Sequence, residues 1–363
     1  MERNQSMTKF KIGYMGGDSH AGTINDMFQD SLPDHPLVES VDWEWTSRRW
    51  GFDARKAVGK SHVVSKLLEY DIIFQNPYEL NDKDNPGLVE FFDANDIWKK
   101  VILYDVADEP GFHFERWRQK CLLYLKRAWD PIQLDALDIG KYPVDGQAVS
   151  RANLIPIDFP MFKEYVDVIP MNFYHKRDLA VTCTLPQTPL HNARGIVAHA
   201  VKNAHFEPVD GWISQVTLFY SSGWVLSSAA TSYREILNPI PPQINWWYVY
   251  MHMLRRTQVL FGAGNHTAYG DHRTWEAFAS GALVVTDRIP VDNPHNPEPG
   301  VHYIKFELDN IPKTMAIVNE LLKDKTERER IAKAGFDHAV AYHSSDARIA
   351  YVMENAVKRL GAK

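Results

Sequence analysis

Residues 270–287 constrain the fold of this chain more than any other segment. They read Gly270-Asp-His-Arg-Thr-Trp-Glu-Ala-Phe-Ala-Ser-Gly-Ala-Leu-Val-Val-Thr-Asp287. This order predicts a loop, a short helix, a turn of small residues and a buried strand. A short apolar strand that follows a helix in this way is typical of a parallel sheet in an α/β domain.

Two charged residues lie in the first turn of that predicted helix. Arg273 and Glu276 are three residues apart, so they share one face. Free backbone N–H groups and the helix dipole favour an anion there. An arginine beside free amides suits a phosphate, and a glutamate one turn further can accept two hydrogen bonds from a sugar diol. The two residues together predict a site for a nucleoside diphosphate with a ribose. Alternatively, Glu276 could only stabilise the helix dipole, and Arg273 could be a surface arginine paired with Asp271.

The length of 363 residues suits two domains. Apolar strands alternate with helices in two blocks, separated by a proline-rich stretch. The first block includes strands at 10–15, 71–75 and 101–105 and a basic helix at 116–129, and the second begins with a strand at 178–183. We expect an acceptor domain at 1–174 that also includes a last helix in 345–363, and a donor domain at 175–344.

The expected fold class is α/β, with two Rossmann-like parallel-sheet domains that face each other across a cleft. Open α/β sheets bind ligands outside the carboxyl ends of their strands. The loop at 16–22 and the loop around Gly270 would therefore both line this cleft. Helices are further expected at 194–203, 245–256, 312–322, 326–342 and 346–360.

A resemblance to a known family covers about a fifth of the chain. The matching pieces are Arg273-x-x-Glu276-Ala-x-Ala-x-Gly281, then Pro299-Gly300-Val-His-Tyr, then Glu329-Arg-Ile-Ala-Lys-Ala-Gly335, then His343 and Arg348. In order and spacing they resemble the donor-binding region of GT-B glycosyltransferases, in particular the spore-maturation-protein-like branch of the group 1 family. That resemblance implies a GT-B architecture in which the C-terminal helix crosses back to the N-terminal domain.

The resemblance also implies a reaction, the transfer of a sugar from a nucleotide-diphosphate sugar to an acceptor hydroxyl. Glu276 would hold the ribose, and Arg273 with the following amides would hold the diphosphate. Many retaining relatives carry a second glutamate eight residues before the ribose glutamate, where this chain has Ala268. Asp271 is the nearest acid, so retaining and inverting transfer both stay open.

Further donor-binding residues are expected around the same site. Arg194 opens a predicted helix and is a second candidate phosphate ligand, with a solvated arginine as the alternative. The loop before Arg273 is expected to contact the donor sugar or diphosphate through Asn265, His266, Tyr269, Gly270 and Asp271.

The first domain is expected to supply the acceptor side. Gly16 and Gly17 would allow a ligand close to the backbone after the first strand. A general base needs a side chain within hydrogen-bond reach of the acceptor hydroxyl. The candidates for this catalytic role are Asp18, His20, Asp105, Asp108 and His113, and each of them alone could be structural.

Other functional classes are disfavoured by what the sequence lacks. No His-Glu-x-x-His motif is present and no Asp-x-Asp triplet ends a predicted strand, so we expect no metal and no cofactor, with the donor as substrate. The glycine loop at 16–22 departs from the G-x-G-x-x-G spacing of dinucleotide-binding proteins, which disfavours NAD binding. An NAD-dependent or nucleotide-sugar-modifying enzyme that uses this loop for phosphate stays an alternative. A catalytically silent nucleotide-sugar-binding protein is another.

Composition limits the partners and the compartment. The net charge of −6 argues against a nucleic-acid binder. Two cysteines form no disulfide framework, and neither a signal peptide nor an apolar run of about 18 residues is visible. We expect a cytoplasmic enzyme without a transmembrane segment that acts on a glycan, a lipid-linked acceptor or another hydroxyl acceptor.

Overall fold

The structure is a computed structural model. It describes residues 9–15, 22–43, 66–80, 87–105, 115–127, 153–157, 161–162, 179–184, 192–204, 206, 214–219, 225–227, 246–262, 272–286, 289 and 295–361. The chain forms two compact units, called unit 1 (Met1–Asp158 with Ser345–Lys363) and unit 2 (Phe159–Ser344). The acceptor and donor roles expected for domains at 1–174 with 345–363 and at 175–344 stay a prediction.

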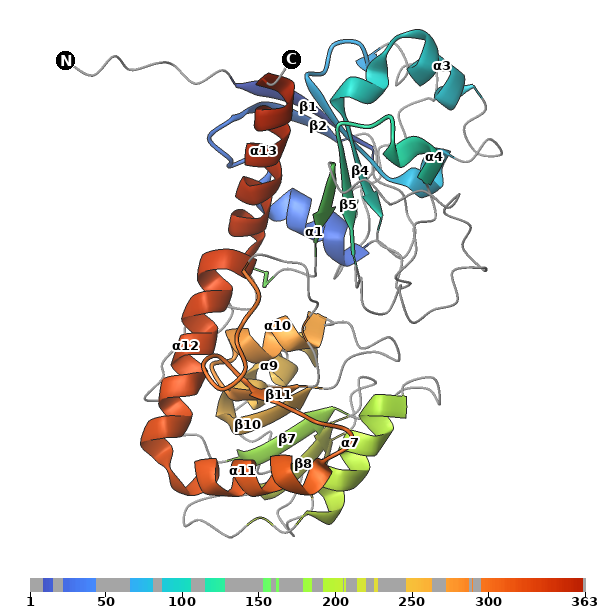
Figure 1. Cartoon of the computed structure of the whole chain (residues 1–363). Coiled ribbons are helices and arrows are strands. Elements are labelled where there is room, and N and C mark those ends of the chain that lie inside the picture. The colour runs from blue at the N-terminus through green and yellow to red at the C-terminus, as the bar shows by residue number, and fades with distance from the viewer. Residues whose placement is uncertain are drawn as a thin grey trace, which may run out of the picture. The chain divides into compact units, whose positions relative to one another are not determined.

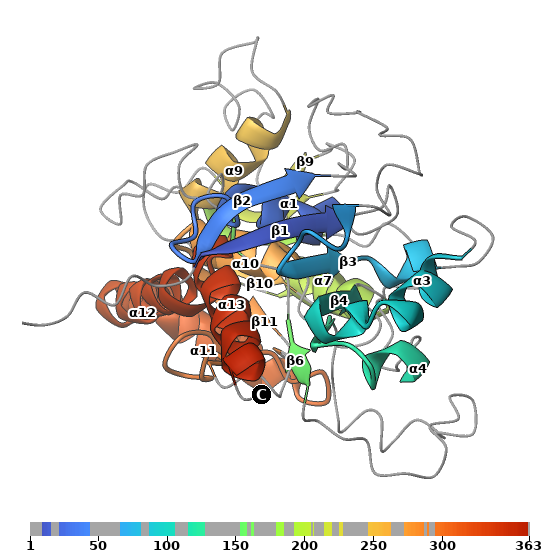
Figure 2. The same cartoon turned by 90° about the horizontal axis from the view of Figure 1, so that it is seen from above.

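Unit 1 contains a parallel sheet with the strand order β2-β1-β3-β4-β5-β6. Figure 2 shows β2, β1, β3 and β4 of this sheet in that order. Every neighbouring pair in this sheet is parallel. The strands are β1 (Phe10–Met15), β2 (Val38–Trp43), β3 (Ile72–Gln75), β4 (Val101–Asp105), β5 (Leu123–Lys126) and β6 (Leu154–Pro156).

Side chains alternate between the two faces of this sheet, and both faces are covered. Tyr14, Phe74 and Tyr104 pack with Phe28 of α1 (Gly22–Ser31) on one face. The other face packs against a shell of short helices, which are α3 (Leu88–Ala94), α4 (Glu115–Arg118), η1 (Pro77–Leu80) and η2 (Ile97–Lys100). Burial on both faces explains why β3 and β4 are almost continuously apolar.

One predicted element of unit 1 is wrong. The basic helix expected at 116–129 ends at Arg118, and the chain then forms β5 between β4 and β6. The residues Leu123–Lys126 are all buried because both faces of a central strand are covered. This burial, including that of the polar Lys126, comes from sheet pairing that a helical pattern does not reveal.

The C-terminal helix belongs to unit 1. α13 (Ser345–Gly361) packs against α1, as Figure 1 shows. Its buried residues include Ile349, Val352 and Met353, which recur at helical spacing on one face. Near its end, the Arg359 guanidinium donates to the carbonyl oxygen of Leu122 at 3.3 Å. The last helix therefore returns to the N-terminal unit, as the fold prediction required.

Unit 2 contains a second sheet with the order β12-β11-β10-β7-β8-β9. The pairs are parallel except for β8 with β9, which is antiparallel. The strands are β7 (Leu179–Thr184), β8 (Ser214–Phe219), β9 (Val225–Ser227), β10 (Thr257–Gly262), β11 (Leu283–Thr286) and β12 (Ile304–Lys305). Two parallel sheets covered by helices confirm the predicted α/β class.

Helices cover both faces of this second sheet as well (Figure 1). One core joins the strands to α7 (Asn192–Asn203), α11 (Ile311–Lys323) and α12 (Lys325–His343), while α9 (Trp246–Arg256) and α10 (His272–Ala279) both contact β10. Val259 and Phe261 of β10 lie in that core beside Val318 of α11. Alternate side chains of each buried strand thus pack against helices on opposite faces of the sheet.

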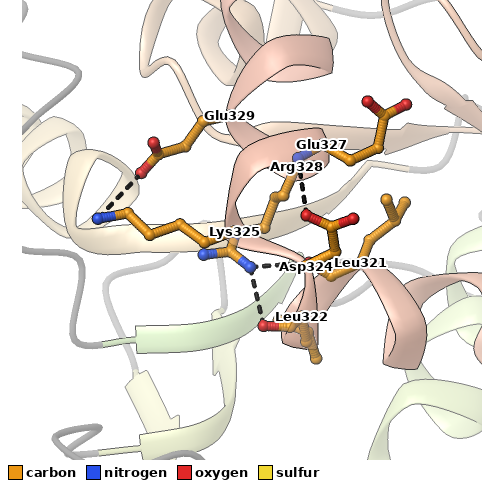
Figure 3. Close-up of polar contacts among 7 residues, drawn as sticks. All are labelled: Leu321, Leu322, Asp324, Lys325, Glu327, Arg328 and Glu329. Atoms are coloured by element: carbon orange, nitrogen blue, oxygen red, sulfur yellow. Dashed lines mark hydrogen bonds and ion pairs between the residues drawn. The ribbon is translucent and has the colours of Figure 1, made fainter.

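The corner between α11 and α12 is held by side chains that satisfy the helix ends (Figure 3). Asp324 accepts a hydrogen bond from the Glu327 backbone N–H at 3.0 Å and so caps α12. Arg328 is buried and donates to the carbonyl oxygens of Leu321 and Leu322 at 2.7 and 2.8 Å. These bonds occupy the carbonyl groups that the end of α11 leaves unpaired.

α12 also approaches α10 closely, and a glycine makes this possible. A Cβ atom on Gly335 would overlap the His302 carbonyl oxygen and would lie 2.8 Å from Cε1 of Phe278. Gly335 is one of the residues that carried the resemblance, and its lack of a side chain lets α12 seat against the helix that contains Arg273 and Glu276. Its role is close approach, because nothing in its backbone conformation requires glycine.

Candidate functional site

The site is built on α10, which lies between β10 and β11 in the chain. The Ser280 N–H donates to the Glu276 carbonyl oxygen and the Gly281 N–H to that of Phe278, both at 2.9 Å. Gly281 has a φ of 67°, which is the left-handed conformation that ends many helices. The predicted order of short helix, small-residue turn and buried strand is therefore confirmed.

Arg273 and Glu276 are both held inside unit 2. Their exposed fractions are 8% and 5%, and they lie three residues apart on α10. Burial of a charged group is costly unless hydrogen bonds or opposite charges compensate it. The same burial strengthens any charge-assisted hydrogen bond that the two groups make to a ligand.

Trp275, between these two residues, anchors the helix. Its side chain is fully buried, and its ring stacks on the His343 imidazole with centroids 4.3 Å apart and planes 26° apart. The same indole packs against Phe278 at 5.7 Å. His343 ends α12, so this stack joins the end of one helix to the first turns of another.

A backbone carbonyl holds the histidine side of this contact. The Nε2 atoms of His343 and His338 lie 2.6 and 2.8 Å from the His295 carbonyl oxygen, so both imidazoles donate to it. His338 in turn lies beside the rings of His302 and Tyr342, at 4.3 and 4.9 Å. The segment that begins at His295 is thereby bound to α12.

Most predicted donor-binding residues cannot be placed. Asn265, His266, Tyr269, Gly270 and Asp271 lie outside the described residues. Arg194 lies near the start of α7, as predicted, but its side chain also falls outside the description. Only Arg273 and Glu276 of this predicted set have described side chains, and the structure places both on the same helix.

Among the predicted catalytic residues, only Asp105 is described. Gly16, Gly17, Asp18, His20, Asp108 and His113 lie outside the described residues. Asp105 ends β4 and is fully buried. Its Oδ2 atom accepts a hydrogen bond from the Tyr124 hydroxyl at 2.6 Å and lies 3.3 Å from the Nζ atom of Lys126, which is also fully buried.

These contacts bear on what Asp105 can do. The Asp105 carboxylate is already engaged within unit 1 by a phenol hydroxyl and an ammonium group from the neighbouring strand. Tyr124 and Lys126 lie on β5 in register with Leu103 and Asp105 of β4. The sequence analysis missed both partners because it assigned their segment to a helix.

Sequence reasoning also missed the roles of Trp275 and His343. His343 was part of the matching pattern, but no contact could be assigned to it from its position in the chain. Trp275 carried a usable signal, since a large aromatic residue between two charged residues on a short helix needs an apolar partner.

The described residues limit other chemistry. Burial raises the pKa of the Cys121 thiol to about 12, so this thiol stays protonated and unreactive near neutral pH. Within the described ranges, no group of three or more His, Cys, Asp or Glu side chains is arranged to bind a metal ion. None of the helices in those ranges is long and apolar enough to cross a membrane.

Comparison with protein families gives one match. Residues 246–354 match the model of a family described as glycosyl transferase-like, and this segment includes Arg273, Glu276 and His343. No curated protein matches the chain in sequence. The match does not test the spore-maturation-protein-like branch.

Solved structures resemble the chain over nearly its full length. A glycosyltransferase from Rickettsia africae ESF-5 aligns with a TM-score of 0.57 at 8% identity, over 97% of this chain and 99% of the other. An alpha-glucosyltransferase bound to UDP-glucose and DNA aligns with a TM-score of 0.53 at 10% identity, over 96% and 100%. Anabaena HepE bound to UDP and glucose aligns with a TM-score of 0.50 at 14% identity, over 95% and 99%. These likenesses confirm the predicted GT-B fold.

Proposed function

We propose that this chain of GT-B fold is a glycosyltransferase that moves a sugar from a UDP-sugar to an acceptor hydroxyl, with Arg273 and Glu276 as donor ligands. The observation that carries the proposal is that these two buried charged residues lie on one face of α10, inside the segment that matches the family model. UDP is preferred over other nucleotides because both HepE and the alpha-glucosyltransferase are bound to UDP or its glucose ester.

The chemistry follows from where charge develops. As the sugar leaves, negative charge accumulates on the diphosphate, and a preformed cation beside helix amides stabilises it. Arg273 supplies this cation in the first turn of α10. Glu276 accepts hydrogen bonds from the two ribose hydroxyls, which fixes the donor relative to Arg273. This arrangement performs the transfer without a divalent metal.

The acceptor side is proposed only by class. The acceptor carries a free hydroxyl, as in a glycan or a lipid-linked sugar, and the catalytic base comes from unit 1. One structural relative is bound to DNA. The net charge of −6 still favours an acceptor other than nucleic acid. Cytoplasmic location likewise remains part of the proposal.

The test is calorimetric titration with UDP in excess EDTA. Glu276→Gln removes the charge but keeps the shape, so we expect UDP affinity to fall about ten- to a hundredfold, or about 1.5–3 kcal/mol. Arg273→Met should weaken UDP at least as strongly because it removes a charge that faces the diphosphate. Glu320→Gln, on the exposed side of α11, is the matched control and should leave UDP affinity unchanged.

Two outcomes would contradict the proposal. Normal UDP affinity in Glu276→Gln with a lowered melting temperature would make Glu276 a purely structural helix acid. Binding of UDP by the unaltered chain only after addition of Mg²⁺ or Mn²⁺ would remove the metal-independent part. A turnover assay with UDP-glucose and simple sugar alcohols separates an active enzyme from a protein that only binds nucleotide.

A further inference from the structure

The chain passes from unit 2 to unit 1 between Ser344 and Ser345, one residue after His343. Ser344 is the last residue of unit 2, and it ends α12 in an extended conformation. The other passage between the units lies between Asp158 and Phe159. Met161, just after it, donates its N–H to the His343 carbonyl oxygen at 2.6 Å and forms a β-bridge with Ser344.

His343 therefore takes part in two sets of contacts. Its backbone is hydrogen-bonded to the second connecting segment through Met161. Its fully buried side chain stacks on Trp275 and donates to the His295 carbonyl oxygen. One residue thus joins the connection between the units to the helix that carries Arg273 and Glu276.

We propose that His343 is a positioning residue for donor binding, which fixes α10 through its stack on Trp275 and its hydrogen bond to the His295 carbonyl. This inference rests on the proposed function of α10 as the donor helix. His343 does not contact the donor itself, and it acts through the place and rotation of α10.

The short length of α10 explains why such an anchor matters. An eight-residue helix has little stability of its own, so tertiary contacts hold it in place. Arg273 and Glu276 flank Trp275 on this helix, so a rotation about the indole moves both charged groups together. Small displacements of groups that orient a ligand can cost up to about a hundredfold in function.

The neighbouring histidine provides a matched comparison. His338 donates to the same carbonyl oxygen as His343, through the same ring nitrogen. Among the described rings, the partners of His338 are His302, Tyr342 and His343. Only His343 of the two stacks on Trp275. A role in donor positioning should therefore be specific to His343, whereas a role in holding the 295 segment would be shared.

Three variants separate the two contacts. His343→Phe keeps a ring against Trp275 but loses the N–H donor, and His343→Gln keeps a donor but loses the ring. His338→Gln is the matched control. UDP affinity is measured by calorimetry well below each melting temperature, so that loss of folded protein does not contribute. We expect His343→Gln to lower the affinity for UDP about tenfold. The affinity of His343→Phe should lie between that of His343→Gln and that of the unaltered chain, and His338→Gln should bind UDP with unchanged affinity.

The inference is overturned if both folded His343 variants bind UDP normally, or if His338→Gln weakens UDP as much as His343→Gln. If His343→Gln does not fold, Trp275→Phe replaces it, because a smaller ring reduces the same stack. Normal UDP binding by Trp275→Phe would then overturn the inference. Arg273→Met distinguishes this failure from that of the proposed function. If Arg273→Met also binds UDP normally, α10 is not the donor helix at all.

Discussion

The two units differ in where their buried charged residues lie and in what holds them. In unit 1, Asp105 and Lys126 lie on neighbouring strands, fully buried, and neutralise each other with Tyr124 as a third partner. In unit 2, Arg273 and Glu276 lie on a short helix that follows β10, and a buried aromatic stack holds that helix.

Under the proposed function, this difference separates structural charges from charges placed for a ligand. Charges on paired strands have a geometry fixed by the sheet, and opposite charges there satisfy one another. Charges on a helix can be aimed together at a ligand, provided that apolar contacts fix the helix. We therefore expect substitutions in unit 1 to reduce stability and substitutions on α10 to reduce nucleotide affinity.

The largest effect is expected for Lys126→Met. It leaves the Asp105 carboxylate buried without its cation, which should lower the free energy of unfolding by about 3–5 kcal/mol in urea denaturation. The double variant Lys126→Met/Asp105→Leu should recover most of that loss, because no buried charge remains. Lys333→Met, which breaks an exposed pair with Asp337 in unit 2, should cost at most about 1 kcal/mol.

Nearly equal stability of Lys126→Met and Lys333→Met would remove the distinction between the two units. It would mean that water or a nearby group compensates Asp105 once Lys126 is absent.

Two helix glycines of unit 2 should respond oppositely to alanine. Gly335→Ala places a methyl group against the His302 carbonyl and Phe278, so we expect a loss of about 1–3 kcal/mol. Gly195→Ala in α7 meets no atom within 4 Å and should stabilise by about 0.5–1 kcal/mol. Thermal unfolding of both variants checks this, and equal shifts would show that α12 can move away from α10 at no cost.

Loss of the α12 cap should have a smaller effect that stays within unit 2. Asp324→Ala removes the acceptor of the Glu327 N–H and should cost about 1 kcal/mol of stability, whereas Asp324→Asn should retain most of it. UDP affinity should be unchanged in both, since the cap lies at the α11–α12 corner. A measurable loss of UDP binding would show that the placement of α10 depends on the whole of α12.

The smallest effect expected is on pH dependence, with one histidine in each unit. Burial lowers the pKa of His302, the nearby His338 lowers it further, and Glu298 partly offsets this by raising it. Burial also lowers the pKa of His35, which Glu354 and Asp346 of α13 partly offset by raising it. Each ring accepts a backbone N–H at Nδ1, which requires the neutral form.

The sign follows from proton uptake. Because the folded pKa values lie below the unfolded value of about 6.5, the unfolded chain binds protons first as the pH falls. Stability is thus retained above about pH 6.5 and decreases below it. Denaturation between pH 5 and 7 should show a shallower decrease in His302→Asn and His35→Asn, and an unchanged slope in both would contradict the lowered values.

Local sequence signals determined much of this protein. Apolar runs predicted β1, β3, β4, β7 and the segment from α10 to β11, because buried parallel strands need continuous apolar residues. The spacing of Arg273 and Glu276 placed both on one helix face, since helical geometry depends only on separation along the chain. The amphipathic pattern of residues 346–360 also predicted the C-terminal helix, whereas its return to the first domain was implied by the family resemblance.

Only the tertiary structure decided which distant residues meet. The segment Leu123–Lys126 became a strand because β4 and β6 pair with it, and that pairing brought Lys126 and Tyr124 to Asp105. The stack of Trp275 on His343 joins residues that lie far apart in the chain. Such contacts depend on how whole elements pack, and packing between distant elements leaves no periodic signal in the sequence that would reveal the partner.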